Sequence, residues 1–393
     1  MQNIGIVAEF NPFHNGHKHL IDTVKTKDSK IICVMSGNFV QRGDTAIFPK
    51  AERVTAALAG GVDMVVELPT PWAMSTAQNF AFGSVSILKS TGFVDKIAFG
   101  SECGDIASLI NTAKLIESEE FNAKLGENLN TGSTFAKLRS DLAGDISPVY
   151  KEILTNPNDT LATEYISAAS HLNFNCEFKA VKRIGAAHDS FDEDITVSAS
   201  KLREDIKNGN FESIKKYMPS NSFNAIKTVP VSNIKNIETA ILADLRKKLS
   251  DKSLSKIADI SEGLDNRFLK AVSNSVTLEE LYQNLKTKRY TLARIRRIVL
   301  SAFLDIDNSF FNKQPPYIRV LGIREDALEL LPQLVASATV PVICNVDDIN
   351  KLDEFGLRVW ELENTSTDLF SLSLNFPQRC GNEYYHKLIK GDF

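Results

Sequence analysis

Two histidines near the start of the chain, His14 and His17, have the types and spacing suited to phosphate chemistry. Residues three apart in a helix lie on one face, so the two imidazoles are predicted to be neighbours. Imidazole N–H groups donate hydrogen bonds to oxygens that gain charge in a transition state. Gly16 lies between them and has no Cβ, which lets a phosphate approach the backbone. The alternative is a helix that carries two surface histidines, and this motif alone does not decide between them.

The segments around the histidines predict how they are positioned. Ile4–Phe10 is an apolar run typical of a buried strand in a parallel sheet, and residues 11–13 interrupt it. Leu20, Ile21 and Val24 give the following segment the apolar stripe of a helix. A strand, a tight loop and a helix N-terminus together aim unpaired backbone N–H groups and the positive end of the helix dipole at a bound anion.

Composition limits the class of protein. The chain has 393 residues, which predicts two or three domains, and its net charge of −4 excludes a globally basic nucleic-acid-binding surface but not a local one. Its five cysteines form no CxxC pair, which is typical of buried thiols rather than disulfides or a zinc site. We find no signal peptide and no apolar run of membrane-spanning length, so we expect a cytoplasmic protein.

Strand and helix patterns alternate over residues 1–205, which predicts an α/β fold with a parallel sheet. After Ile4–Phe10, the strand candidates are Lys30–Met35, Asp63–Leu68, Asp95–Phe99 and Glu177–Val181. In such sheets ligands bind beyond the carboxyl ends of the strands, where the strand order reverses. We expect the loops after the first and fourth strands to flank that reversal, so that His14, His17 and Gly100 line one crevice.

A second stretch, Ser198–Arg203, also points to an anion. Ser198 is a predicted N-cap, and Lys201 and Arg203 follow in or near the first helical turn. Cations are unfavourable at a helix N-terminus, so two of them there indicate a nearby anion. The alternative is solvated charge on an ordinary helix.

Together the two stretches resemble the paired signatures of the HIGH-type nucleotidyltransferases, His-x-Gly-His and ISSTxxR. Ser200 stands where that second signature has threonine, and it keeps the hydroxyl. The resemblance implies a Rossmann-like nucleotidyltransferase core and attack by an acceptor oxygen on the α-phosphate of a nucleoside triphosphate. It also implies ATP with Mg²⁺. Because no carboxylate cage is visible, we expect no dedicated metal site and an ion that arrives with ATP.

The wider motifs resemble one family, the bacterial tRNA(Met) cytidine acetate ligases. They are AEFNPFHNGH, MSGNFVQRGD, VVELP, FGSE, NPNDTLATEY, KRIGAAHD, SASKLR, ISEGLDNR and KRYTLARIRRI. The chain departs from the family at Asp44-Thr45, where Glu-Pro is common, and at Ala162, where Gly is common. The implied activity has two steps. Acetate and ATP give acetyl-adenylate and pyrophosphate, and the acetyl group then passes to N4 of the wobble cytidine 34 of elongator tRNA(Met), forming N4-acetylcytidine.

The resemblance also implies roles for individual residues. His14, His17 and Arg203 are expected to be catalytic. ATP is expected to contact Val7, Ala8, Glu9, Phe10, Asn11, His14, Gly16, His17, Leu20, Gly100, Asn158, Arg183, Ser198, Ser200 and Arg203. Gln41-Arg42 lies where relatives contact the acceptor.

A basic segment is the candidate tRNA surface. Its cations are Lys286, Lys288, Arg289, Arg294, Arg296 and Arg297. Leu292, Ile295 and Val299 recur at helical spacing and are predicted to face inward, while Arg289 and Arg296 share another face. The alternative is an ordinary solvated helix.

The expected organisation is therefore a catalytic ATP-binding domain over residues 1–205, a helical domain over 206–310 and a small α/β region or cap over 311–393. Two other functions stay open. One is an adenylyltransferase that acts on a small metabolite. The other is an ATP-binding tRNA module that has lost turnover.

Overall fold

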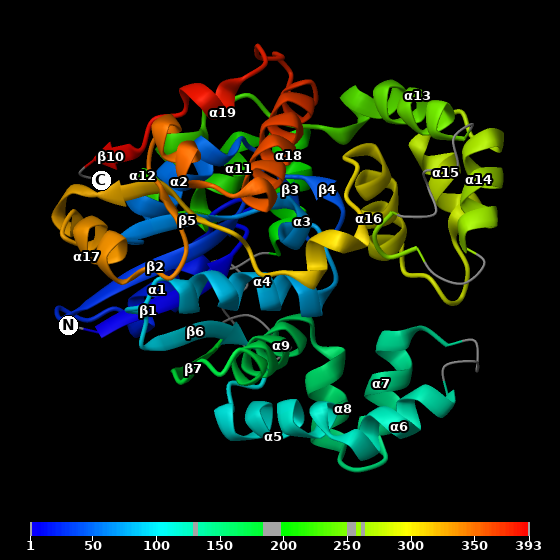
Figure 1. Ribbon diagram of the computed structural model, residues 1–393, viewed down its shortest axis with the longest axis horizontal. Coiled ribbons are helices and arrows are strands. Elements are labelled where there is room, and N and C mark those ends of the chain that lie inside the picture. Colours follow the sequence, from blue (N-terminus) through cyan, green and yellow to red (C-terminus); the bar gives the residue numbers. More distant parts are fainter. Residues whose placement is uncertain (1, 129–132, 184–197, 250–256, 261–263, 392–393) are drawn as a thin grey trace.

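The computed structural model describes residues 2–128, 133–183, 198–249, 257–260 and 264–391. A twisted sheet forms its centre (Figure 1). The parallel part of that sheet consists of β1 (Gln2–Ala8), β2 (Ser29–Ser36), β5 (Met64–Leu68), β6 (Lys96–Ser101) and β7 (Glu177–Lys182). These strands confirm the five predicted ones to within two residues at each end.

The strand order places the predicted crevice. The order within the parallel part is β5-β2-β1-β6-β7, so the chain moves outward on one side of β1 and then returns to its other side. β1 pairs with β6 in parallel, with Ile4 opposite Lys96 and Ile6 opposite Ala98. The loops that follow β1 and β6 therefore leave the same edge of the sheet side by side, where the strand order reverses, as predicted.

Helices cover both faces of the sheet. Along β2, Ile31, Cys33 and Met35 belong to one buried cluster and Ile32 and Val34 to the other, as alternation along a strand requires. The first cluster includes side chains of α1 (Asn15–Val24) and α2 (Lys50–Ala59), and the second those of α4 (Ala77–Ser90) and α9 (Pro157–His171). β2 is thus buried on both faces, which explains why its sequence is almost continuously apolar.

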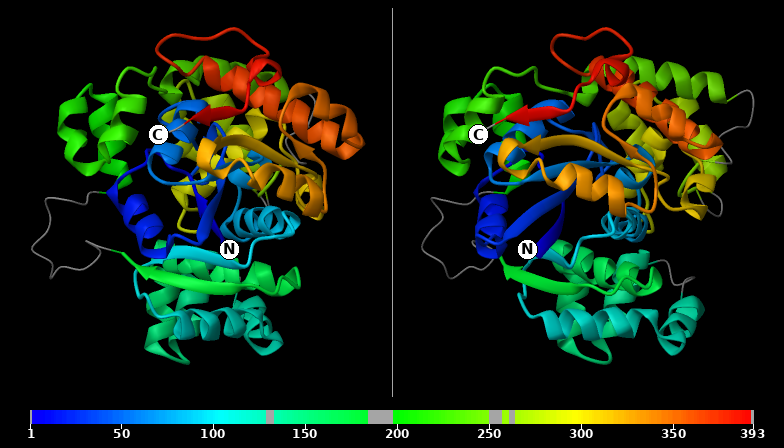
Figure 2. Two further views of the ribbon diagram at one scale, coloured as in Figure 1. Left: turned by 90° about the vertical axis from the view of Figure 1, so that its left-hand side faces the viewer. Right: turned by 60° about the vertical axis from the view of Figure 1, so that its left-hand side comes forward.

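A helical segment separates β6 from β7. It contains α5 (Ile106–Glu117), α6 (Glu119–Asn128), α7 (Phe135–Gly144), α8 (Pro148–Thr155) and α9. Figures 1 and 2 place this segment and β7 at one edge of the sheet, opposite the C-terminal elements. α9 packs against α4 and β6, and the N-terminus of α9 lies at the loop after β6.

The C-terminal region has the predicted α/β character, with α17 (Leu330–Ser337), α18 (Glu354–Ser371) and α19 (Asn382–Tyr385). Its strands join the same sheet. β8 (Ile318–Arg324) runs antiparallel to β5, and β9 (Val342–Ile343) and β10 (Ile389–Gly391) pair with β8. The sheet thus spans the first and last predicted regions of the chain, and the domain boundaries themselves stay a prediction.

Buried ion pairs hold this junction together. Arg319 of β8 and Lys50 of α2 both contact Glu67 of β5, at 3.0 Å and 2.5 Å. Lys50 also contacts Glu383 of α19 at 2.5 Å. All four side chains are almost fully buried, and burial of a charge is tolerated only when it is paired in this way.

The region between the two α/β parts is helical, as predicted. α10 (Ala199–Lys207), α11 (Phe211–Ile214) and α12 (Ser220–Ile226) lie beside the N-terminal elements, and α12 packs on α2. α13 (Glu238–Lys248), α14 (Leu264–Asn274), α15 (Leu278–Leu285) and α16 (Leu292–Phe303) gather at one end of the molecule (Figure 1). Among the described helices, none has the length and apolar character required to cross a bilayer.

A short hairpin connects this helical group to the sheet. β3 (Phe39–Val40) and β4 (Asp44–Thr45) pair antiparallel, and Gly43 lies between them with a φ of +71°. A Cβ on Gly43 would lie 2.5 Å from the backbone nitrogen of Arg297 in α16. Gly43 therefore allows both the left-handed turn and the close approach of the hairpin to α16.

We predict that Gly43→Ala lowers the free energy of unfolding by about 1–3 kcal/mol, because the new methyl group meets backbone atoms in a strained conformation. Gly126→Ala in α6 is the control, since no atom lies within 4 Å of its added Cβ, and it should change stability by less than about 1 kcal/mol. Urea unfolding of both variants tests this. Equal stabilities would contradict the proposed close contact.

Candidate active site

The loop after β1 holds the two histidines in one fixed arrangement. His14 caps α1, and its Nδ1 accepts a hydrogen bond from the Gly16 N–H at 3.0 Å. The Nδ1 atom of His17 accepts from the His14 N–H at 3.2 Å, and the two rings stack with centroids 3.9 Å apart. Since each Nδ1 is an acceptor, a neutral ring carries its proton on Nε2. Both imidazoles are thus set up as Nε2–H donors.

Gly16 has a second reason to be glycine. A Cβ at this position would lie 2.9 Å from Cε1 of the His14 ring. The residue therefore leaves room for the stacked imidazole as well as for an approaching phosphate. Phe10 is 1% exposed and lies edge-on to the His17 ring with centroids 5.0 Å apart, so it supports this ring from behind.

The surroundings keep the two imidazoles neutral. Burial, and after it the positive charge of Arg183, lowers the pKa of His14 to about 4. Burial and then the adjacent His14 hold the pKa of His17 well below its ordinary value. Near pH 7 the rings are therefore hydrogen-bond donors without a positive charge, and charge neutralisation at this site falls to the neighbouring arginines.

The predicted second motif reaches this loop. Ser198 caps α10 and accepts from the Lys201 N–H at 3.3 Å. Arg203, one turn into the helix, donates from Nη1 to the backbone oxygen of Asn11 at 2.8 Å and from Nη2 to the Ser200 hydroxyl at 3.1 Å. Two segments that are far apart in the sequence thus meet through one guanidinium group.

Arg183 completes the cationic side of the crevice. It follows β7, and its backbone N–H donates to the Ser101 carbonyl at 2.9 Å. A Cβ on Gly100 would lie 3.6 Å from Cγ of Arg183, so this arginine covers the end of β6 at the glycine. The strand order β1-β6-β7 thus places Gly100 and Arg183 beside the histidine loop.

The loop after β6 is tied to α9 by two carboxylates. Glu102 accepts from the Asn158 side-chain amide at 2.5 Å and from the Asp159 N–H at 3.0 Å. In return, buried Asp159 accepts from the Glu102 N–H at 2.9 Å and the Cys103 N–H at 3.1 Å. One N–H of the Asn158 side-chain amide is therefore already engaged, and the predicted contact with ATP would use the second N–H or the amide oxygen. Glu102 and Asp159 were not singled out, although both lie in quoted motifs.

Arg53 is a second contributor that the sequence analysis missed. It is 1% exposed, and it donates to the backbone oxygens of Glu9 at 2.6 Å, Ser36 at 3.1 Å and Phe48 at 3.1 Å, and also to that of Gly37. One buried guanidinium thus joins the carboxyl ends of β1 and β2. Burial lowers its pKa to about 10, so it stays charged near neutral pH.

Glu9 lies where these loops converge. Its carboxylate accepts from the Gln41 N–H at 2.8 Å. Burial raises its pKa, against the opposing charges of Arg203, Arg42 and Arg53. The Glu9 carboxyl group therefore lies between the histidine loop and the loop of Gln41 and Arg42. The positive charges of three arginines act on it.

The remaining predicted ATP contacts surround the same loop. Val7 and Ala8 end β1 and are partly exposed, and Leu20 lies on α1, packed against the core. The side chain of Asn11 is buried and accepts from the Ile47 N–H at 2.7 Å. Most of KRIGAAHD and part of ISEGLDNR lie outside the described residues. Among the described residues, no group of three or more His, Cys, Asp or Glu side chains has the arrangement to hold a metal.

The predicted tRNA segment divides into two parts. Lys286, Lys288 and Arg289 are exposed in the connection before α16. The three arginines on α16 have partners in this chain. Arg294 and Arg297 contact Asp259 at 3.2 Å and 3.4 Å, and Arg296 lies over the Tyr282 ring at 5.6 Å.

Two details of the predicted stripe are wrong. Ile295 and Val299 are buried as expected, but Leu292 is 39% exposed because it occupies the first turn, beyond the packed part of the helix. Arg289 and Arg296 do not share a helix face, because α16 begins only at Leu292. The exposed cations therefore lie on a connection rather than along a helix.

Comparisons with known proteins agree with this geometry. Residues 1–383 match the family described as HIGH Nucleotidyl Transferase. The tRNA(Met) cytidine acetate ligase of Thermoanaerobacter sp. (strain X514) is 36% identical over 404 residues, which cover 98% of this chain and 99% of the relative. That of Clostridium kluyveri (strain ATCC 8527) is 34% identical and covers 93% of this chain and 95% of the relative.

Solved structures show the same likeness. The crystal structure of Thermotoga maritima TmcAL bound with alpha-thio ATP is 30% identical, with a TM-score of 0.89, and the match covers 99% of this chain and 100% of that one. An apo form of the same protein also gives a TM-score of 0.89.

A histidine loop after the central strand, met by a serine–arginine helix at the carboxyl edge of a parallel sheet, is the arrangement expected of a nucleotidyltransferase-fold enzyme. The likeness to the curated relatives extends over the whole chain, including the helical and C-terminal regions. The chain belongs to the HIGH nucleotidyl transferase family and, within it, to the tRNA(Met) cytidine acetate ligases. This confirms the resemblance seen in the sequence motifs.

We predict a pH effect from buried His14. Its pKa is about 4 in the folded protein and near 6.5 when unfolded, so the unfolded chain binds a proton first as the pH falls. The contribution of neutral His14 to the unfolding free energy is therefore complete above pH 6.5 and is lost as the pH falls from 6.5 to about 4. His14→Gln removes this loss, so between pH 7 and pH 5 its unfolding free energy should fall less than that of the parent, by up to about 2 kcal/mol.

Urea unfolding of both proteins at several pH values checks the prediction, with circular dichroism at pH 7 as the control for folding. An identical fall in the parent and in His14→Gln would contradict a neutral, buried imidazole.

Proposed function

We propose that this enzyme is an ATP-dependent ligase. It activates acetate as acetyl-adenylate, releases pyrophosphate and transfers the acetyl group to N4 of the wobble cytidine 34 of elongator tRNA(Met). The observation that carries the proposal is the hydrogen bond from Arg203 to the Asn11 carbonyl, because it brings the two phosphate-binding motifs to one crevice. The names of the curated relatives supply the acceptor and the RNA.

In the first step, the Nε2–H groups of His14 and His17 donate to oxygens of the α-phosphate as acetate attacks. Donors that are already oriented stabilise charge that develops only in the transition state. Arg203, with Ser198 and Ser200, holds the β- and γ-phosphates as pyrophosphate leaves. Mg²⁺ bound to the triphosphate would offset the remaining charge.

The adenosine lies against the end of β6 at Gly100, with Arg183 and Asn158 as further contacts to ATP. Acetate approaches from the loop of Gln41 and Arg42, where cationic groups surround Glu9. In the second step the wobble base enters the same crevice, and its N4 amine attacks the acetyl carbon with AMP as the leaving group. A weakly nucleophilic exocyclic amine requires such an activated donor.

We predict that His17→Ala reduces acetate-dependent exchange of labelled pyrophosphate into ATP by at least about 100-fold, since one oriented donor is lost from the transition state. The assay contains no RNA. His19→Ala, in the same helix, is the matched control and should exchange like the parent. A His17→Ala variant with parental exchange would remove the catalytic assignment.

The same assay tests the proposed function against its alternatives. Exchange that requires acetate supports the ligase. Exchange that requires another small molecule would instead indicate an adenylyltransferase for that molecule. A parent protein without exchange for any acceptor would indicate a silent binding module. Acetylation of purified tRNA with labelled acetate, followed by nucleoside analysis, tests the second step.

For tRNA binding we predict a division within the basic segment. Replacing Lys286, Lys288 and Arg289 together by Ala should weaken tRNA binding, because these cations are exposed. The slope of log affinity against log salt concentration should also fall, by the equivalent of up to about three phosphate contacts. RNA-free exchange should not change. The α16 arginines are a poorer test, because their loss would leave Asp259 unpaired.

The matched control replaces Arg379, Lys387 and Lys390, three exposed cations of the C-terminal region, and makes the same change in net charge. Filter binding over a range of salt concentrations measures both triple variants. Equal weakening by the two triples would show that the effect reflects net charge and would refute a specific site at residues 286–289.

A further inference from the structure

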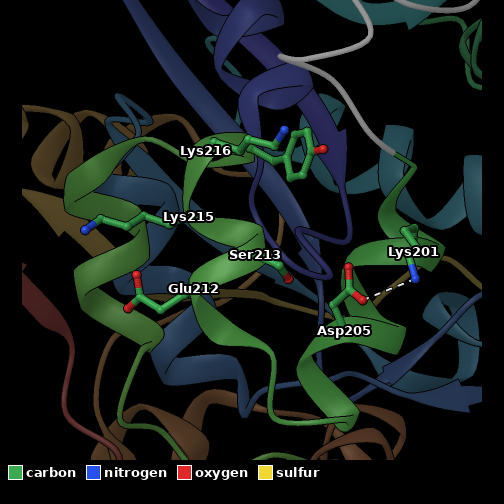
Figure 3. A pocket seen from close by; sticks show the side chains of 7 residues that line it. Lys201, Asp205, Glu212, Ser213, Lys215 and Lys216 are labelled. Carbon is green, nitrogen blue, oxygen red and sulfur yellow. Dashed lines mark ion pairs between the residues drawn. The ribbon is translucent and has the colours of Figure 1, made fainter.

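A groove next to the active site is assigned no role by the proposed chemistry. It has a volume of about 580 Å³ and lies between α10 and the turn formed by α11 and the 3₁₀ helix η2 (Lys215–Tyr217). In Figure 3, Lys216 lies across the groove from Lys201 and Asp205, which form an ion pair with an Nζ–Oδ1 distance of 3.2 Å. Tyr217 also lines the groove.

Both walls of this groove are attached to the histidine loop. On one side, Arg203 of α10 donates to the carbonyl of Asn11 at 2.8 Å. On the other side, the amide of Asn15 donates to the backbone oxygen of Lys216 at 3.0 Å. The two anchor points flank His14 in the sequence. The groove therefore lies beside the histidine loop, and the elements that form its two walls are bonded to that loop.

The lining combines an aromatic ring with charges of both signs. Nζ of Lys216 lies 4.9 Å from the centroid of the Tyr217 ring, and Lys215 and Lys216 are exposed. Asp205 and Glu212 add carboxylates. A ligand made only of phosphates, such as the triphosphate tail, would be repelled by these carboxylates, and Lys201 is already paired with Asp205 and Glu204.

A nucleotide fits this mixture better. Its base can stack on an aromatic ring, its amino groups can donate to carboxylates, and its phosphate can contact a lysine. The turn that carries Tyr217 is firmly seated, because Ile214 and Met218 on either side of it are buried in the core. The ring is thus presented by a rigid support rather than by a free loop.

We propose that this groove binds the single-stranded RNA nucleotide adjacent to the target cytidine, with its base stacked on Tyr217. The inference rests on the proposed function, since it requires that a base of an RNA loop enters the crevice. A base that leaves its RNA loop to enter the crevice draws the adjacent nucleotides to the edge of the active site. The groove lies at that edge, next to the histidine loop.

The test uses the full chain and an anticodon stem-loop RNA with 2-aminopurine next to the wobble cytidine. The parent should quench the probe by stacking. Tyr217→Ala should lose the quench and bind about tenfold more weakly, whereas Tyr217→Phe, which keeps the ring, should behave like the parent. Tyr385→Ala removes a ring that is 80% exposed elsewhere and is the matched control.

RNA-free pyrophosphate exchange is measured on the same variants and should stay at the parental level. Parental quenching and affinity in Tyr217→Ala would overturn the proposal, and so would a loss of exchange equal to the loss of RNA binding, because the groove would then serve ATP. A parent that binds and quenches the RNA but does not acetylate it would refute the proposed function while the groove assignment stands.

Discussion

The hydrogen bond between Arg203 and the Asn11 carbonyl is the contact on which the active site depends. It joins a helix that follows the last parallel strand to a loop that follows the first one. In the proposed reaction the histidine loop holds the reacting phosphate and the serine–arginine helix holds the leaving group, so both motifs are required. The sheet makes the contact possible, since the order β1-β6-β7 gathers their loops at one edge.

Two kinds of hydrogen-bond donor lie at this edge of the sheet, neutral imidazoles and charged guanidinium groups. Burial lowers the pKa of both His14 and His17 and keeps the rings neutral, so in the proposed reaction they act through oriented Nε2–H bonds. The net charge comes from Arg183 and Arg203, which flank them.

Much of this arrangement was predictable from local sequence. The five parallel strands, the cap at Ser198 and the crevice at the strand-order reversal follow from apolar runs, capping residues and the rule for ligand sites in α/β sheets. Long-range partners were not predictable in this way. Arg53 looks like an ordinary helix cation, and only the folded chain shows that the carbonyls of β1 and β2 surround it.

The basic segment shows the same limit. A helical pattern in the sequence does not reveal where the first turn begins, so Arg289 was placed on a helix that starts three residues later. Nor does it reveal that Asp259, far away in the sequence, takes up two of the arginines. In the same way, apolar strand patterns at the C-terminus predicted an α/β region but not that β8 would add to β5.

The two halves of the proposed reaction are physically connected through the hairpin of β3 and β4. The Gln41 N–H donates to Glu9 beneath the crevice, and the Gln41 carbonyl accepts from Arg297 of α16 at 3.5 Å. Arg297 in turn contacts Asp259. The backbone of Gln41 thus lies between the proposed site of adenylate formation and the helical group next to the exposed cations. Because Gly43 allows the hairpin to touch α16, a shift of that helix on binding RNA would move the backbone that holds Glu9.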